Sequence, residues 1–207
     1  MRDGEALSPA AAEAFVDAVE VAVLERGIAV VALSGGTTAK KLFSLLTETP
    51  FAERLEPLWP RVHVFFAAER HVGPLHPESR YRVVHWSLLS RFDVPGRNIH
   101  RVRTTMSDPR HTAAAYENEL RSFFASKGLM RDGLPCLDLA LIALEPGSER
   151  EEIASRRDVE GCWVTTDGEQ ILLTLPVLGN ARSALVLFPS GDAAAAGSAA
   201  HLLRFVA

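Results

Sequence analysis

The amino-acid sequence predicts an α/β protein in which a mostly parallel sheet is covered by helices on both faces. Three observations support this fold class: short apolar runs recur along the chain, stretches of helical periodicity alternate with them, and glycine, proline or charged residues separate the two. Alternating strands and helices are typical of parallel sheets, whose strands are buried on both faces and are therefore almost wholly apolar. With 207 residues and no repeat or linker, the chain is predicted to form one domain, residues 1–207.

Apolar runs bounded by turn residues are predicted to be the strands of this sheet. Its central strands are expected at Ile28–Leu33, Val62–Phe66, Leu137–Ala143 and Ala184–Phe188. Two shorter strands are expected at Trp163–Thr166 and Gln170–Leu175.

Helices are predicted in the stretches between the strands. The first is expected to begin at Ser8 and Pro9 and to end at Gly27, because serine is a good N-cap and proline suits a first turn. Apolar stripes at helical spacing predict further helices, the last of which would close the chain. These are expected at Ser79–Leu89, from Ala113 to near Gly128, and at Ala193–Phe205.

A glycine turn joins the first strand to the helix that follows it. Its residues are Ser34, Gly35, Gly36, Thr37 and Thr38. Such a turn aims backbone N–H groups past the end of the strand, and the helix dipole adds partial positive charge there, so a phosphate or carboxylate is the expected guest. A turn with a purely structural role is the alternative. Neither the dinucleotide fingerprint nor the P-loop fingerprint is present.

A charged loop with two prolines is predicted at residues 68–81, directly after the second strand. In open α/β sheets, ligands bind outside the carboxyl ends of the strands. The loop and the glycine turn therefore form the candidate binding region.

Composition excludes several functional classes. A formal net charge of -4 gives no reason to expect a nucleic acid or an acidic membrane surface as a partner. Cys136 and Cys162 make no disulfide framework, and no Cys/His cluster predicts zinc. The first residues lack the apolar core of a signal peptide, and no apolar run reaches the ~20 residues of a membrane span. We expect a soluble, cytoplasmic protein.

Four ordered motifs carry a resemblance to a known family. They are Ser34–Thr38, Phe65–Val72, Pro77–Tyr81 and Leu173–Pro176, the last followed by Asn180, Ala181 and Arg182. Their order and spacing resemble those of 6-phosphogluconolactonases, a branch of the glucosamine-6-phosphate isomerase/deaminase group. The resemblance implies a Rossmann-like three-layer α/β/α fold and a sugar-phosphate pocket at the carboxyl ends of the strands. It also implies lactone-ring hydrolysis in the pentose phosphate pathway, without metal or cofactor. We expect the protein to be a monomer or homodimer.

The sequence departs from the family pattern where that pattern carries chemistry. Ala68 stands where the family's Asp-Glu-Arg motif has its aspartate, while Glu69 and Arg70 are kept. Where the family has a glycine-rich loop ending in a histidine, this chain runs from Ala143 to Arg150, and Glu149 takes the place of the histidine. That histidine is the family's expected general base. An ordinary Glu carboxylate, with a pKa near 4.3, is a weaker base than imidazole.

The resemblance and the charged loop together give the candidate site residues. Catalytic candidates are Glu149, His71 and Glu69, with His71 as a substitute for the missing base. Candidates for binding phosphate and substrate are the five residues of the glycine turn together with Arg70, Ser79 and Tyr81. The alternatives are that residues 145–157 are a solvated segment without catalytic part, and that His71 is a surface residue.

Three functions therefore remain open from the sequence. The chain is an active 6-phosphogluconolactonase with a rearranged loop, a non-catalytic relative that binds a sugar phosphate, or a scaffold subunit. Retention of the glycine turn favours phosphate binding, and the changes at Ala68 and Glu149 favour weak or absent turnover.

Overall fold

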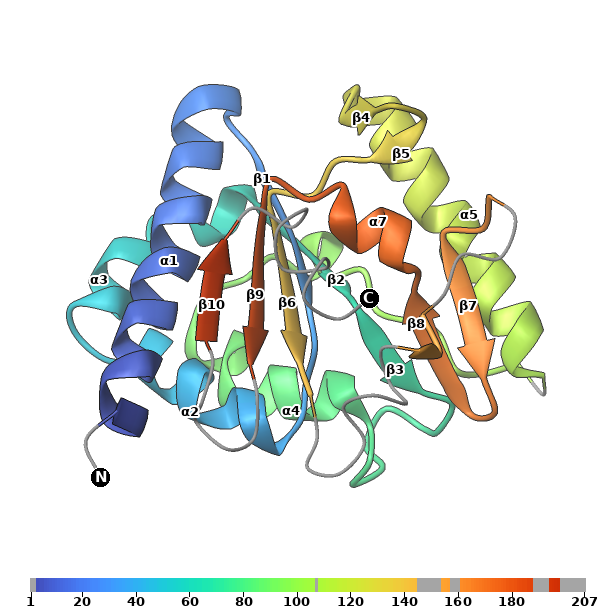
Figure 1. The fold of residues 1–207 in the computed structure, drawn as a ribbon, viewed down its shortest axis with the longest axis horizontal. Helices are drawn as coiled ribbons and strands as arrows, with labels where there is room; N and C mark the ends of the chain where they lie inside the picture. Colours follow the sequence, from blue (N-terminus) through green and yellow to red (C-terminus); the bar gives the residue numbers. More distant parts are fainter. Residues whose placement is uncertain (1–2, 107, 145–153, 157–160, 188–193, 198–207) are drawn as a thin grey trace.

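A five-stranded sheet forms the centre of the molecule (Figure 1). The computed structural model describes residues 3–106, 108–144, 154–156, 161–187 and 194–197. The strand order is β10-β9-β6-β1-β2. These strands are β1 (Ala29–Leu33), β2 (Val62–Phe66), β6 (Leu139–Ala143), β9 (Ser183–Leu187) and β10 (Ala194–Gly197). All neighbours are parallel except β10, which runs antiparallel to β9. The predicted mostly parallel sheet is therefore confirmed.

The strands form where the apolar runs predict them, because these positions are buried on both faces of the sheet. Every residue of β1 and of β6 is buried, and Val31 pairs with Val64 on one side and with Leu139 on the other. The expectation that β2 lies centrally is wrong, because it is an edge strand. The chain covers that edge at Ile99, which bridges to Val64.

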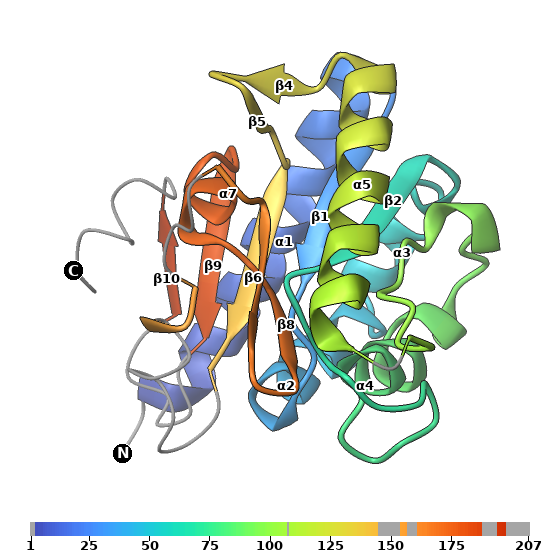
Figure 2. The ribbon, with the colours of Figure 1, turned by 90° about the vertical axis from the view of Figure 1, so that its right-hand side faces the viewer.

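Helices cover both faces of the central sheet. On one face, α1 (Asp3–Arg26) packs against β1 and contacts both α2 (Thr37–Leu46) and α3 (Phe51–Leu55). On the other face, α5 (Pro109–Lys127) lies beside β2 (Figure 2). The hydroxyl of its buried Tyr116 accepts from the Phe66 N–H at 2.7 Å. The predicted three-layer arrangement follows from this placement.

A second, smaller sheet begins directly after β2. It consists of β3 (Ala68–Arg70), β8 (Gln170–Leu173) and β7 (Val164–Asp167), all antiparallel. The prediction that residues 68–70 are loop is therefore wrong, since they pair with β8. The strand predicted to reach Leu175 ends at Leu173, because Thr174 is already the N-cap of α7 (Leu175–Gly179), which has a proline in its first turn.

Two helix predictions also differ from the structure. Helix α1 begins at Asp3 rather than at Ser8, with Pro9 inside it. The alanine-rich segment predicted as a closing helix instead forms strand β10 over residues 194–197, and the rest of that prediction lies outside the described residues. Alanine has the highest helix propensity, but propensity is a weak determinant of structure that tertiary contacts override, and here β10 pairs with β9.

The remaining elements are short, apart from α4 (Arg80–Ser87), which lies close to its prediction. The 3-10 turns are Trp59–Arg61, Leu89–Arg91 and Gly96–Asn98, and β4 (Met130–Arg131) pairs with β5 (Leu134–Pro135). Helix α5 ends at Gly128, whose φ of 65° suits glycine. None of the helices within the described residues has the length and apolar character needed to cross a membrane.

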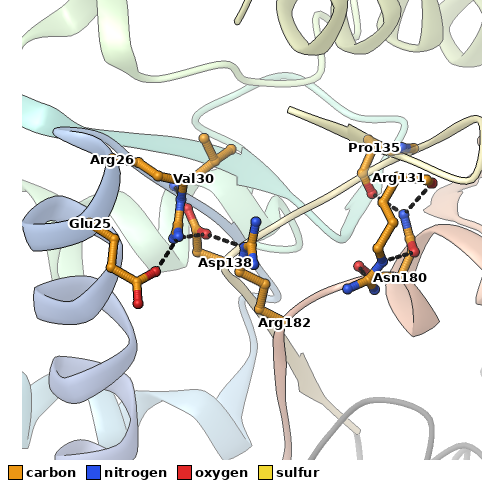
Figure 3. A network of polar contacts seen from close by, with 8 residues as sticks. All are labelled: Glu25, Arg26, Val30, Arg131, Pro135, Asp138, Asn180 and Arg182. Carbon is orange, nitrogen blue, oxygen red and sulfur yellow. Dashed lines mark hydrogen bonds and ion pairs between the residues drawn. The ribbon is translucent and has the colours of Figure 1, made fainter. Parts of the chain in front are cut away.

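A buried carboxylate ties the elements together at the amino ends of the strands (Figure 3). Asp138, just before β6, accepts from the Val30 N–H at 2.8 Å and from Arg26 Nη2 at 2.6 Å. Arg182 Nε lies 3.4 Å away on its other side. Asp138 is 3% exposed, and burial raises the pKa of its carboxyl group. This network is at the end of the sheet away from the glycine turn, so its role is structural.

Candidate functional site

The glycine turn lies at the point where the order of the strands in the sheet reverses. From β1 the chain passes to β2 on one side, and later enters β6 on the other side. Ligands in open α/β sheets bind outside the carboxyl ends of strands at such a switch point. In Figure 1 these ends lie at the bottom, where α2 and α4 are seen. The topology therefore puts the turn where a ligand is expected.

The turn is fixed to β6 and to the residue that follows β6, and its Gly36 supplies no side-chain cap to α2. Ser34 N–H donates to the Leu141 carbonyl at 2.9 Å, and Thr38 Oγ1 donates to the Leu144 carbonyl at 2.7 Å. Gly36 is the N-cap residue, with a φ of 147° that favours glycine and with no side chain to bind the first N–H groups. The arrangement suits an anion at this helix end.

Ser34 adds a further polar group to the turn. Its side chain is fully buried. Within the part of the chain that the structure describes, its hydroxyl has no hydrogen-bond partner. A buried hydroxyl without a partner is costly, so a polar group at this position would stabilise the turn.

Glu69 is buried beneath the start of α4 and is 2% exposed. Oε1 accepts the N–H groups of Arg70 at 2.8 Å and Arg80 at 2.7 Å. Oε2 accepts the Tyr81 N–H at 2.8 Å and the Ser79 hydroxyl at 3.3 Å. Burial raises the pKa of the Glu69 carboxyl, and these hydrogen bonds oppose the rise. Both carboxylate oxygens thus hold the chain at the start of α4 in place, which suits a positioning residue.

The start of α4 and the glycine turn are in direct contact through Gly35 and Arg80. A Cβ on Gly35 would lie 2.4 Å from the Arg80 carbonyl oxygen, so only glycine allows this approach. Arg80 Nη1 donates to the Gly35 carbonyl at 2.9 Å, and Arg80 Nη2 donates to Gln170 Oε1 at 3.4 Å. Arg80 was not among the residues expected from the sequence. The only signal for it was its place in the third motif, between the candidates Ser79 and Tyr81.

Arg70 and His71, by contrast, have partners elsewhere. Arg70 is exposed, and its Nε lies 3.4 Å from Glu78 Oε2. His71 is partly buried with Nε2 3.0 Å from Thr112 Oγ1 on α5. Among the contacts of the described residues, none joins either side chain to the glycine turn.

The two remaining binding candidates belong to the start of α4. Ser79 is its N-cap and accepts the Arg82 N–H through Oγ. The Tyr81 ring packs edge-on against Phe66, with 5.8 Å between ring centroids, and the Arg101 guanidinium lies 5.5 Å from its centroid. Both residues lie close to Glu69, and Tyr81 is partly exposed.

The sequence departs from the family's catalytic motifs in two segments, at Ala68 and at residues 143–150. Ala68, in the family's aspartate position, is fully buried. Its neighbour Ala67 accepts through its carbonyl from Nη1 of the fully buried Arg156 at 2.7 Å. Glu149 lies outside the described residues. Within the described part of the chain, no three His, Cys, Asp or Glu side chains are grouped so that they could hold a metal.

Comparison with known proteins agrees with the architecture. Residues 2–201 match the model of the family described as glucosamine-6-phosphate isomerases/6-phosphogluconolactonase. A 6-phosphogluconolactonase of Synechocystis is 34% identical over 176 residues, which are 80% of this chain and 68% of that protein. One of Nostoc is 31% identical over 199 residues, 91% of this chain and 78% of that protein.

Solved structures show the same fold. A 6-phosphogluconolactonase of Trypanosoma cruzi superposes with a TM-score of 0.69 at 22% identity, covering 87% of this chain and 75% of that one. A 6-phosphogluconolactonase of Thermotoga maritima superposes with a TM-score of 0.68 at 23% identity, covering 90% and 80%. On the family match and the sequence relatives, this chain belongs to the glucosamine-6-phosphate isomerase/6-phosphogluconolactonase family.

Proposed function

We propose that this protein binds 6-phosphogluconolactone at the glycine turn and hydrolyses it far more slowly than relatives that keep the family's aspartate and histidine. The observation that supports binding is the start of α2 at the switch point of the sheet, where the N-cap residue is a glycine without a capping side chain. The phosphate group would lie over the backbone N–H groups after Gly36. Both named sequence relatives are 6-phosphogluconolactonases, which supports this substrate class.

Slow turnover follows from what the reaction needs. Water attacks the lactone carbonyl carbon while a base takes its proton, and the ring ester bond then breaks to give a carboxylate and a hydroxyl group. The charge that develops on the carbonyl oxygen needs hydrogen-bond donors. Ala68 can neither accept a proton nor orient a donor, and Glu149 lacks the proton affinity of imidazole. Loss of a general base typically lowers the rate by ~10²–10⁴.

The test follows the disappearance of 6-phosphogluconolactone with and without protein, because the lactone also opens spontaneously. We expect a rate close to that background, together with calorimetric binding of 6-phosphogluconate. The matched control is Gly36→Val, which strains the turn at a φ of 147° and should abolish binding. A relative with the complete motifs gives the reference rate.

The other outcomes assign the function differently. A rate far above background that Glu149→Ala abolishes would make Glu149 the base, and one that only His71→Ala abolishes would make His71 the base. Either result would overturn the proposal of slow turnover. The absence of any 6-phosphogluconate binding would overturn the proposed site and leave the scaffold role. Binding with no acceleration at all would establish the non-catalytic sugar-phosphate binder.

A further inference from the structure

The starts of two helices meet at the candidate site, and a buried carboxylate already binds the N–H groups of one of them. Helix α4 begins at Arg80, where the Glu69 carboxylate already accepts the N–H groups of Arg80 and Tyr81. A second anion there would face a buried negative charge. At the start of α2 the N-cap residue, Gly36, has no side chain and brings no such negative charge, so α2 is the better of the two helix starts for an anion.

Arg80 connects the two helix starts. Its backbone carbonyl occupies the space above Gly35 that a side chain would otherwise fill, and its guanidinium donates to the Gly35 carbonyl at 2.9 Å. The backbone of Arg80 is itself held by Glu69 at 2.7 Å. Contacts of both the backbone and the side chain of Arg80 therefore hold its guanidinium beside the glycine turn.

Arg70, the other arginine considered for phosphate binding, is placed differently. Its side chain is 44% exposed and pairs with Glu78 at 3.4 Å. A cation of that exposure contributes little to binding because water screens it. Arg80 is partly buried and in contact with the turn, so its charge acts at short range and in a less polar environment.

We propose that Arg80 is a specificity-determining residue, whose guanidinium binds the phosphate group of the ligand above the glycine turn. A planar guanidinium matches phosphate oxygens with paired N–H donors, which a lysine does not. The arrangement favours phosphate monoesters over the same sugars without phosphate. This inference deepens the proposed function, on which its choice of ligand rests.

The test measures binding of 6-phosphogluconate and of inorganic phosphate by calorimetry, for the wild type, Arg80→Gln and Arg80→Lys. Glutamine keeps a donor for the Gly35 carbonyl but loses the positive charge. Lysine keeps the charge but loses the planar pair of N–H donors. The matched control is Arg61→Gln, which removes the same charge from an exposed position beside the amino end of β2. Thermal unfolding of each variant shows whether it is folded.

We expect Arg80→Gln to weaken 6-phosphogluconate binding by about 10- to 100-fold, the size typical of hydrogen bonds to charged groups. Arg80→Lys should fall between Arg80→Gln and the wild type, and Arg61→Gln should match the wild type. Equal affinity of Arg80→Gln and the wild type would overturn the role of Arg80 while leaving the proposed function intact. Equal losses in the Gln and Lys variants, both with lowered unfolding temperatures, would overturn it in favour of a structural role.

Inorganic phosphate separates the inference from the proposed function. If the wild type binds phosphate in an Arg80-dependent manner but does not bind 6-phosphogluconate, Arg80 keeps its role and the proposed ligand is wrong. If the wild type binds neither probe, both proposals are overturned.

Discussion

Replacing Gly35 by alanine tests the contact between the glycine turn and the start of α4. The added Cβ would lie 2.4 Å from the Arg80 carbonyl oxygen and 3.0 Å from the Arg80 carbonyl carbon and Cα. These are backbone atoms, and the adjacent N–H is bound to Glu69, so they cannot yield as a flexible side chain would. Gly35 has no positive φ. The effect of the substitution is therefore steric.

The size of the effect follows from that distance. Cβ contacts below 3.0 Å essentially do not occur, so the turn and α4 must separate by roughly 0.6 Å or more. Overpacking of this kind costs about 1–3 kcal/mol, and a displacement near 1 Å at a site can reduce activity ~10²-fold. We expect Gly35→Ala to lose about 1–3 kcal/mol of unfolding free energy and about tenfold or more in affinity for 6-phosphogluconate.

Urea unfolding and calorimetry measure the two quantities. Gly96→Ala is the matched control, because its added Cβ meets nothing within 4 Å and its φ is not positive. Equal unfolding free energies and equal affinities of Gly35→Ala and Gly96→Ala would contradict the steric effect at Gly35.

Two further predictions concern stability away from the site. Asp138→Asn should lower the unfolding free energy by about 3 kcal/mol, because it leaves two arginines around a neutral group. Urea unfolding measures this loss. A lowered affinity for 6-phosphogluconate would contradict a purely structural role of Asp138. Burial lowers the pKa of His63 to about 4. Nearby positive charges add to the shift, and the largest of these contributions comes from His100. The unfolded chain binds this proton near pH 6.5, so stability should fall by about 1–2 kcal/mol between pH 7 and pH 5. His63→Phe should flatten that decline, and an unchanged profile would contradict it.

The central strands could be predicted because burial on both faces leaves a direct mark on the sequence. Strand β1 is apolar throughout, and its limits lie within one residue of the prediction. Strand β10 could not be predicted, because its alanine-rich sequence favours helix and only the neighbouring β9 makes it a strand. The three residues of β3 are too few to show an alternating pattern, so its pairing with β8 was also missed.

The candidate site could be located but not assembled from the sequence. The glycine turn was found because strand, glycines and helix are adjacent in the chain. The choice between Arg70 and Arg80 depends on the path of the chain between them, which returns Arg80 to Gly35 and turns Arg70 towards Glu78. The hydrogen bonds of Glu69 to the start of α4 likewise join residues ten or more positions apart. Such contacts have no local signal.

A crystal structure of the protein with bound 6-phosphogluconate would show where the phosphate group lies. We predict that the phosphate group lies over the backbone N–H groups between Gly36 and Thr38, with the Arg80 guanidinium in contact with its oxygens. An ordered 6-phosphogluconate whose phosphate contacts neither the glycine turn nor Arg80 would contradict the account.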